Sequence, residues 1–127
     1  MAEAGAAQGA RVGVASRKAD AWAEVGAAIR GAGGEARAVP AHRGEPEDAE
    51  RLAAATVEAF GGIDIVVNNA ANALAEPLGG ITVAGFEKSF AVNVRGPVLL
   101  VQACLPHLEA SEHAAVVNVV SAGAFLP

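Results

Sequence analysis

The chain has 127 residues, enough for one domain with a buried core and too few for two. Hydrophobic residues make up 53% of it and charged residues 18%, which excludes intrinsic disorder and favours a packed α/β domain with a heavily buried sheet. The net charge of −5 and the scattered Lys and Arg residues argue against binding to a nucleic-acid backbone, which requires clustered cations.

Cys104 is the only cysteine, so no internal disulfide can form, and its apolar neighbours predict a small buried residue. We therefore expect a reducing, cytoplasmic location. Residues 1–10 lack the basic stretch and apolar run of a signal peptide, and no segment reaches the about 18 continuous apolar residues of a membrane span. We expect neither a leader nor an anchor.

Residues 11–41 predict a strand, a helix and a second strand. Residues 11–16 form a short apolar run with β-branched valines, which is typical of a strand. Residues 19–30 carry apolar side chains at helical spacing, and the glycines that follow would end the helix. Those apolar positions are Trp22, Val25 and Ile29. Residues 36–41 predict an alanine-rich second strand.

Residues 46–71 predict a helix and a third strand. Pro46 suits the first turn of a helix, and the Gly61-Gly62 pair would end it. Leu52, Val57 and Phe60 supply the stripe that we expect to be buried. Residues 63–67 then form an apolar strand that leads directly into Asn68-Asn69-Ala70-Ala71.

Residues 82–121 predict a long helix and a fourth strand. Apolar residues recur at helical spacing over residues 82–108, after a good N-cap at Thr82. Pro97 should kink or restart this helix near residues 93–96. Residues 114–120 form the fourth strand, and Ser121 begins the loop beyond it.

The alternation of strands and helices predicts right-handed crossovers in a parallel sheet. In such a sheet ligands bind at the carboxyl ends of the strands, beside a switch in strand order. Every strand end of this chain offers hydrogen-bonding groups. These are Ser16-Arg17, His42-Arg43, Asn68-Asn69 and Ser121.

Three segments in chain order resemble the short-chain dehydrogenase/reductase family. Residues 61–71, Gly-Gly-Ile-Asp-Ile-Val-Val-Asn-Asn-Ala-Ala, resemble a strand followed by the family's Asn-Asn-Ala-Gly motif. Residues 91–96, Ala-Val-Asn-Val-Arg-Gly, resemble a helix motif, and residues 116–121, Val-Val-Asn-Val-Val-Ser, resemble the strand that ends in the active-site serine. The resemblance is closest to the classical carbonyl-reductase-like subgroup. It implies a Rossmann-like, doubly wound parallel sheet of the α/β class, with residues 1–127 as a single partial dinucleotide-binding domain.

The resemblance places the adenosine ribose of the cofactor at Ser16, Arg17 and Lys18. A guanidinium there can hold the 2′-phosphate of NADP in bidentate fashion, whereas an acidic residue would select NAD. The cofactor implied is therefore NADP rather than NAD. The alternative is a solvated basic pair at a strand end. His42 stands where the family commonly has an aspartate that binds the adenine amine, and a stacked imidazole would have to replace it.

The resemblance also assigns roles to the third strand end and to two catalytic positions. Asn68 would tie neighbouring strands together near the ribose, and Asn69-Ala70-Ala71 would allow a close backbone approach, with Ala71 where the family has glycine. Asn93 would hold a water of the proton relay, and Ser121 would polarise the substrate carbonyl. Without the resemblance, Asn93 is a helix break beside Pro97 and Ser121 is a loop residue.

Two motifs of the family have no counterpart in this sequence. Residues 1–10 lack the glycine-rich loop that holds the pyrophosphate, and their Gly9-Ala10 pair instead resembles the end of the family's first helix. The Tyr-x-x-x-Lys motif is also absent, since the sequence contains no tyrosine. A general acid contributes roughly 10²–10⁴-fold to a rate, so we expect no significant turnover from this chain alone.

The family's strand order, 3-2-1-4-5-6-7, would place the strand without a counterpart between residues 11–16 and residues 63–67. A buried central strand contributes a large part of a domain's stability. We therefore expect the two strands beside the gap to pair directly and close it.

Two functions follow from the sequence. The first is a piece of an NADP-dependent oxidoreductase that moves hydride between NADP(H) and a small carbonyl or alcohol substrate, as a homo-oligomer in the complete protein. The second is a non-catalytic binding or oligomerisation module that uses an exposed helix over residues 82–108. No metal is expected, because His42, His107 and His113 lack ligand spacing and should lie on the surface.

Overall fold

The computed structural model describes residues 1–16, 19–42 and 44–122, and for Ser16 and residues 19–23 it describes the backbone alone. The predicted alternation of strands and helices is confirmed, with one short helix before it and a short 3₁₀ helix after the third strand. In chain order the elements are α1 (Ala2–Ala7), β1 (Val12–Ser16), α2 (Ala19–Gly31), β2 (Ala36–Pro40), α3 (Pro46–Phe60), β3 (Ile65–Asn68), η1 (Leu78–Gly80), α4 (Val83–Phe90), the π-helical turn η2 (Ala91–Arg95), α5 (Gly96–Glu109) and β4 (Ala115–Asn118).

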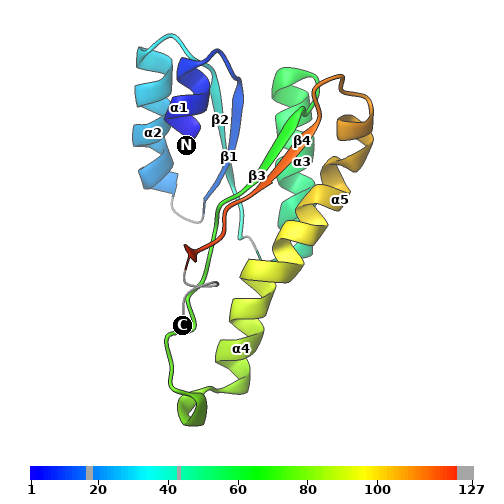
Figure 1. Ribbon diagram of the computed structural model, residues 1–127. Coiled ribbons are helices and arrows are strands. Elements are labelled where there is room, and N and C mark those ends of the chain that lie inside the picture. The colour runs from blue at the N-terminus through cyan, green and yellow to red at the C-terminus, as the bar shows by residue number, and fades with distance from the viewer. Residues whose placement is uncertain (17–18, 43, 123–127) are drawn as a thin grey trace.

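The strands form two separate two-stranded sheets. β1 pairs with β2 in parallel, with Val12 opposite Ala36, and β3 pairs with β4 in parallel, with Ile65 opposite Ala115. Figure 1 shows all four strands running in the same direction. Over the part of the chain that is described, β1 and β3 form no ladder, so the prediction that they pair directly is wrong.

The helices explain why the two sheets stay apart. α1 and α2 pack against the β1–β2 sheet on one side, and α3 packs against it on the other (Figure 1). α5 packs against both α3 and β3. Moving β3 to the roughly 4.8 Å spacing of paired strands beside β1 would carry α5 with it and break its packing against α3. Helix packing therefore fixes β3 at a distance from β1.

The main core lies between α3, β3 and α5. Its buried residues are Ala53, Ile63, Val66, Cys104 and Leu108. Cys104 is 3% exposed, which confirms the prediction that it is buried. A smaller contact joins α1 and α2, where Ala6 and the fully buried Ile29 meet.

The strands are much more exposed than the composition predicted. All four residues of β4 are exposed, and Ile65 of β3 keeps 56% of its surface. The expectation of a heavily buried sheet is therefore wrong for these strands. The physical reason is that the described helices make their main contacts with β1, β2 and β3, so that β4 is supported chiefly by its ladder to β3.

A groove of about 870 Å³ separates the two sheets. Its walls include Val12 to Ala15 of β1 and Ile65 to Asn68 of β3. It runs from Arg11 and Gly62, at the amino ends of these strands, to His42 and Asn69 at the carboxyl ends. Because the groove is as long as the strands, its shape fits an extended chain segment better than a compact ligand at one end.

Local signals explain where the helices begin and end. Pro46 occupies the first turn of α3, and Gly61 ends it in the left-handed conformation with φ 85°, which glycine adopts without a steric penalty. The Thr82 hydroxyl accepts a hydrogen bond from the Gly85 N–H at 3.1 Å and caps α4. The predicted restart beside Pro97 is confirmed, because the π-helical turn η2 ends there and α5 begins.

Candidate functional site

The carboxyl ends of all four strands lie at the same end of the two sheets (Figure 1). Ser16 is opposite Pro40 in the first sheet, and Asn68 is opposite Asn118 in the second. His42 follows β2 by two residues, and Ser121 follows β4 by three. Parallel pairing thus brings the polar strand ends that the sequence singled out to the same edge of the two sheets.

Asn68 and Asn118 join the ends of β3 and β4 through their side chains. Asn68 Nδ2 donates to Asn118 Oδ1 at 2.9 Å, and the Asn68 carbonyl accepts from the Val119 N–H at 2.9 Å. Asn68 therefore ties two neighbouring strands together, in agreement with the structural part of its predicted role. Sequence reasoning assigned no role to Asn118, although the register of two strands that both end in asparagine places them opposite each other.

The loop after β3 is held by Asn93 of the π-helical turn. Asn93 Nδ2 donates to the Asn72 carbonyl at 2.9 Å, and the Asn72 N–H donates to Asn93 Oδ1 at 2.8 Å. Ser89 Oγ donates to the same carbonyl at 2.9 Å and accepts from Asn93 Nδ2 at 3.3 Å. We call these three residues the Asn93 clasp. Neither Ser89 nor Asn72 was identified from the sequence, because Asn72 lies 21 positions from Asn93 and 17 positions from Ser89.

The clasp leaves the intervening residues free to present their backbone. Asn69 and Ala71 are exposed and Ala70 is half-buried, and the short side chains of the two alanines leave the loop open to close approach. Asn69 and Ala70 line the groove at its carboxyl end. This is the geometry that a ligand held by backbone groups would need, and it places both residues beside Asn68.

The loop after β2 is built around His42, whose side chain is half-buried. The His42 N–H donates to Asp48 Oδ2, and the Gly44 N–H donates to His42 Nδ1 at 3.3 Å. Asp48 also pairs with Arg51 at 2.6 Å, and Arg51 Nη2 donates to the Pro40 carbonyl at 2.5 Å. The Asp48 carboxylate is therefore balanced by a cation and by a backbone donor. A second carboxylate, that of Glu45, has its Oε1 3.9 Å from His42 Nδ1.

Four of the predicted strand-end residues carry little structural detail. Arg17 and Lys18 lie outside the described residues, as does Arg43, and Ser16 is described by its backbone alone. Ser121 is exposed, three residues past the end of β4. The β3–β4 ladder ends at the pair of Asn68 and Asn118, so Ser121 follows the end of this ladder by three residues.

The Cys104 thiol lies in the core rather than at the strand ends. Burial disfavours the thiolate and raises the pKa of this thiol above its usual value. A thiol in that state is a poor nucleophile at neutral pH. Cys104 is thus a packing residue.

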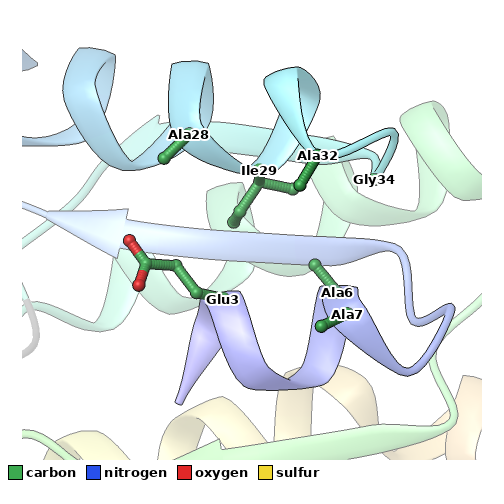
Figure 2. A pocket seen from close by; sticks show the side chains of 7 residues that line it. All are labelled: Glu3, Ala6, Ala7, Ala28, Ile29, Ala32 and Gly34. Carbon is green, nitrogen blue, oxygen red and sulfur yellow. The ribbon is translucent and has the colours of Figure 1, made fainter.

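A second hollow lies between α1 and α2 and is shown in Figure 2. It measures about 340 Å³ and is lined mostly by alanines, with Ile29 at its floor and Glu3 at its side. Ala32 and Gly34 place it at the amino end of β2, which is the end away from His42. Small side chains on two facing helices account for this hollow.

The described parts of the chain lack two further kinds of feature. No group of three or more His, Cys, Asp or Glu side chains there could hold a metal ion. None of the described helices has the length and apolar character needed to cross a membrane. His113 is exposed, whereas His42 and His107 are half-buried rather than fully on the surface as predicted.

Comparison with known proteins gives a consistent result. The profile of the family described as short chain dehydrogenase matches residues 1–127. The dehydrogenase/reductase SDR family member 4 of Pongo abelii is 38% identical over 123 residues, covering 96% of this chain and 44% of the relative. A short chain dehydrogenase from Burkholderia cenocepacia, solved in complex with NADP, superposes with a TM-score of 0.93 at 34% identity, covering 99% of this chain and 51% of that one.

An NADH-dependent reductase responsible for alginate metabolism is also similar, with a TM-score of 0.86 and 32% identity, covering 97% of this chain and 53% of that one. The chain thus spans about half the length of the solved structures, and 44% of the curated relative.

Proposed function

Since the chain belongs to the short-chain dehydrogenase family, we propose that it is the middle part of an NADP-dependent oxidoreductase that moves hydride between NADP(H) and a carbonyl or alcohol. Residues 1–127 would be one partial dinucleotide-binding domain, in a protein of the carbonyl-reductase-like subgroup. The observation that carries the proposal is the Asn93 clasp beside the Asn68–Asn118 bridge at the carboxyl edge of the strands. The clasp and the bridge together fix the loop of residues 69–72 at the edge where a dinucleotide binds such sheets.

The residues at this edge fit an anionic dinucleotide. The groove opens there between His42 and the loop of Asn69 and Ala70, whose small side chains leave backbone groups approachable. Of the two nearby acids, Asp48 is balanced by Arg51 and by a backbone N–H, so it adds little repulsion to a phosphate. The other, Glu45, lies 3.9 Å from His42 Nδ1.

We assign the cofactor as NADP. Arg17 and Lys18 follow β1 directly, and a guanidinium can hold a 2′-phosphate in bidentate fashion. The Burkholderia cenocepacia relative was solved with NADP, whereas the alginate-metabolism reductase is NADH-dependent. Both cofactors therefore occur among the relatives, and the basic pair after β1 is what supports NADP here. Ser16 completes this strand end.

The chain's own residues would bind, orient and move a proton. Ser121 would donate a hydrogen bond to the substrate carbonyl oxygen and stabilise the negative charge that develops on it. Asn93 would keep the loop after β3 and a relay water in place. The cofactor supplies the hydride. Because this sequence contains no tyrosine for the general acid, the isolated chain should not turn over.

The groove supports the view that this chain is part of a larger sheet. Both β1 and β3 have a ladder on one edge, and their other edges face the groove along its whole length. An extended apolar segment placed there could pair with both edges. We propose that the complete protein provides such a strand, together with the glycine-rich loop and the Tyr-x-x-x-Lys motif. We also expect it to be a cytoplasmic homo-oligomer acting on a small molecule.

The test is a chimera in which this chain replaces the matching segment of the Pongo abelii relative. The folded chimera should oxidise NADPH in the presence of carbonyl substrates and prefer it to NADH. Ser121→Ala should lower kcat by roughly 10²–10³-fold. Ser111→Ala is the matched control, because Ser111 precedes β4, at the other end of this strand, where it donates to Asp64. A folded, active chimera that Ser121→Ala leaves unchanged would contradict the proposal.

A second candidate function rests on the exposed apolar stripe of α4, η2 and α5. Phe86, Phe90, Val94, Val98 and Leu105 are each between 43% and 60% exposed, at helical spacing. Such a stripe on one helix is typical of a protein contact. If it is a non-catalytic oligomerisation surface, the 127-residue chain will form a stable oligomer in sedimentation experiments, and Val98→Glu will dissociate it. A monomeric chain would exclude this candidate.

A further inference from the structure

Arg95 connects the π-helical turn to the loop after β2. Arg95 Nη2 donates to the Gly44 carbonyl at 2.7 Å, across 51 positions of sequence. Gly44 is buried, and a Cβ built on it would lie 3.2 Å from the Cβ of Ala91, at the start of the same turn. The loop therefore lies directly on the turn, and the guanidinium fastens it there.

The same turn also holds the other loop of the site. Asn93, two residues before Arg95, clasps Asn72 in the loop after β3. Five residues, Ala91–Arg95, thus fix two loops that follow strands of two different sheets. No strand ladder joins those sheets in the described chain, so this turn is a direct link between the two sides of the groove at its carboxyl end.

Arg95 supplies a partner from outside the His42 loop, in addition to the internal bonds of the loop residues that are described. The Gly44 N–H is already used by His42 Nδ1, and the Glu45 N–H donates to the His42 carbonyl at 3.0 Å. The Gly44 carbonyl is the group that faces the turn. Without Arg95 the loop would lose its attachment to the helix, so its internal bonds would open more often and His42 could shift relative to the loop after β3.

The geometry points to Arg95 as a positioning residue for the adenosine end of the cofactor site, acting through Gly44 on the placement of His42. The inference rests on the proposed function, because it takes an adenosine phosphate as the ligand between these loops. Arg95 itself contacts the loop and not the ligand. Its effect should therefore appear as weaker binding of adenosine phosphates together with a more mobile His42 loop.

The experiment uses the 127-residue chain with adenosine 2′-monophosphate as the probe, titrated by NMR. Arg95→Met removes the donors and keeps the aliphatic stem. It should raise Kd by roughly 5- to 10-fold, less than the full value of a hydrogen bond to a charged group, because the lost bond holds the loop and not the ligand. Arg95→Lys restores a cationic donor and should recover part of the affinity. Lys88→Met, on α4, is the matched loss of an exposed cation and should leave Kd unchanged.

Amide hydrogen exchange without nucleotide provides an independent readout. In Arg95→Met the Gly44 and Glu45 amides should exchange faster, while the Asn72 amide, held by Asn93, should keep its protection. Equal Kd values for wild type and Arg95→Met, or equal loosening at Asn72, would overturn the inference while leaving the proposed function intact. If the wild-type chain binds no adenosine phosphate, the cofactor site itself is wrong, and the inference fails with it.

Discussion

Replacing Asn93 tests whether its side chain holds the loop after β3. The amide makes two hydrogen bonds to the Asn72 backbone, at 2.8 and 2.9 Å, and Asn93 is exposed, so water can replace part of what is lost. At about 0.5–1.5 kcal/mol net for each bond, Asn93→Ala should lower the free energy of unfolding by about 1–2 kcal/mol.

Asn93→Asp makes the prediction more specific. An aspartate keeps an acceptor for the Asn72 N–H but turns the donor that faces the Asn72 carbonyl into a second oxygen. Repulsion between these two oxygens should make Asn93→Asp no more stable than Asn93→Ala, although aspartate has nearly the same shape as asparagine. The comparison separates the hydrogen-bond pattern from the volume of the side chain.

Urea unfolding gives the assay, with the midpoint and slope measured for each variant. Gln102→Ala removes an exposed amide from α5 and serves as the control, with little change expected. Exchange of the Asn72 amide should quicken in both Asn93 variants. An Asn93→Asp chain as stable as the wild type, or a protected Asn72 amide in Asn93→Ala, would refute the reasoning.

Two other perturbations test the packing. A Cβ added at Gly13 would lie 2.4 Å from Thr56 Oγ1, and this hydroxyl is fixed by its 2.8 Å bond to the Leu52 carbonyl, so Gly13→Ala should lower the free energy of unfolding by about 1–3 kcal/mol. In the double variant, Thr56→Ala should recover much of that loss. A double-mutant cycle measures the recovery, and simple additivity would count against the contact. Because burial raises the pKa of Cys104, its thiol should react with iodoacetamide at pH 8 at least about tenfold more slowly in the folded chain than in urea. For the same reason the free energy of unfolding should fall as the pH rises above the unfolded thiol's pKa. Equal reaction rates in the two states would contradict the burial of Cys104.

The order of the elements could be predicted because local signals were strong. Pro46 and Gly61 mark both ends of α3, and the restart of the long helix followed from Pro97. The π-helical form of the turn before α5 could not be predicted, because it coincides with contacts to Asn72 and Gly44 that are distant in sequence. Local patterns give the limits of a helix but not the loops that it will hold.

The pairing of β1 with β3 was predicted wrongly for a related reason. Unpaired strand edges alone favour pairing, but the helices packed on these strands oppose it. In the structure α3 packs against β1, β2 and α5, and α5 packs against β3, so the helix layer sets the distance between the sheets. The open groove and the exposed β4 both follow from that arrangement.

The sequence predicted which strand ends form the candidate site, but it did not predict the contacts that their side chains make. Asn68, Asn93 and His42 were identified from motif positions, and the structure places all three at the carboxyl edge. Their partners Asn118, Asn72 and Gly44 lie between 2 and 50 positions away, and only the fold identifies them. The roles proposed for Ser121, Arg17 and Lys18 stay predictions.

The central claim is that the two sheets are halves of one larger sheet in a longer oxidoreductase. The most direct measurement is the DNA sequence on both sides of this reading frame. We predict a glycine-rich strand, turn and helix encoded upstream and a Tyr-x-x-x-Lys motif downstream, in frame or one frameshift away. Undisturbed start and stop signals around these 127 codons would contradict the claim and would leave the groove between β1 and β3 to be filled by another molecule.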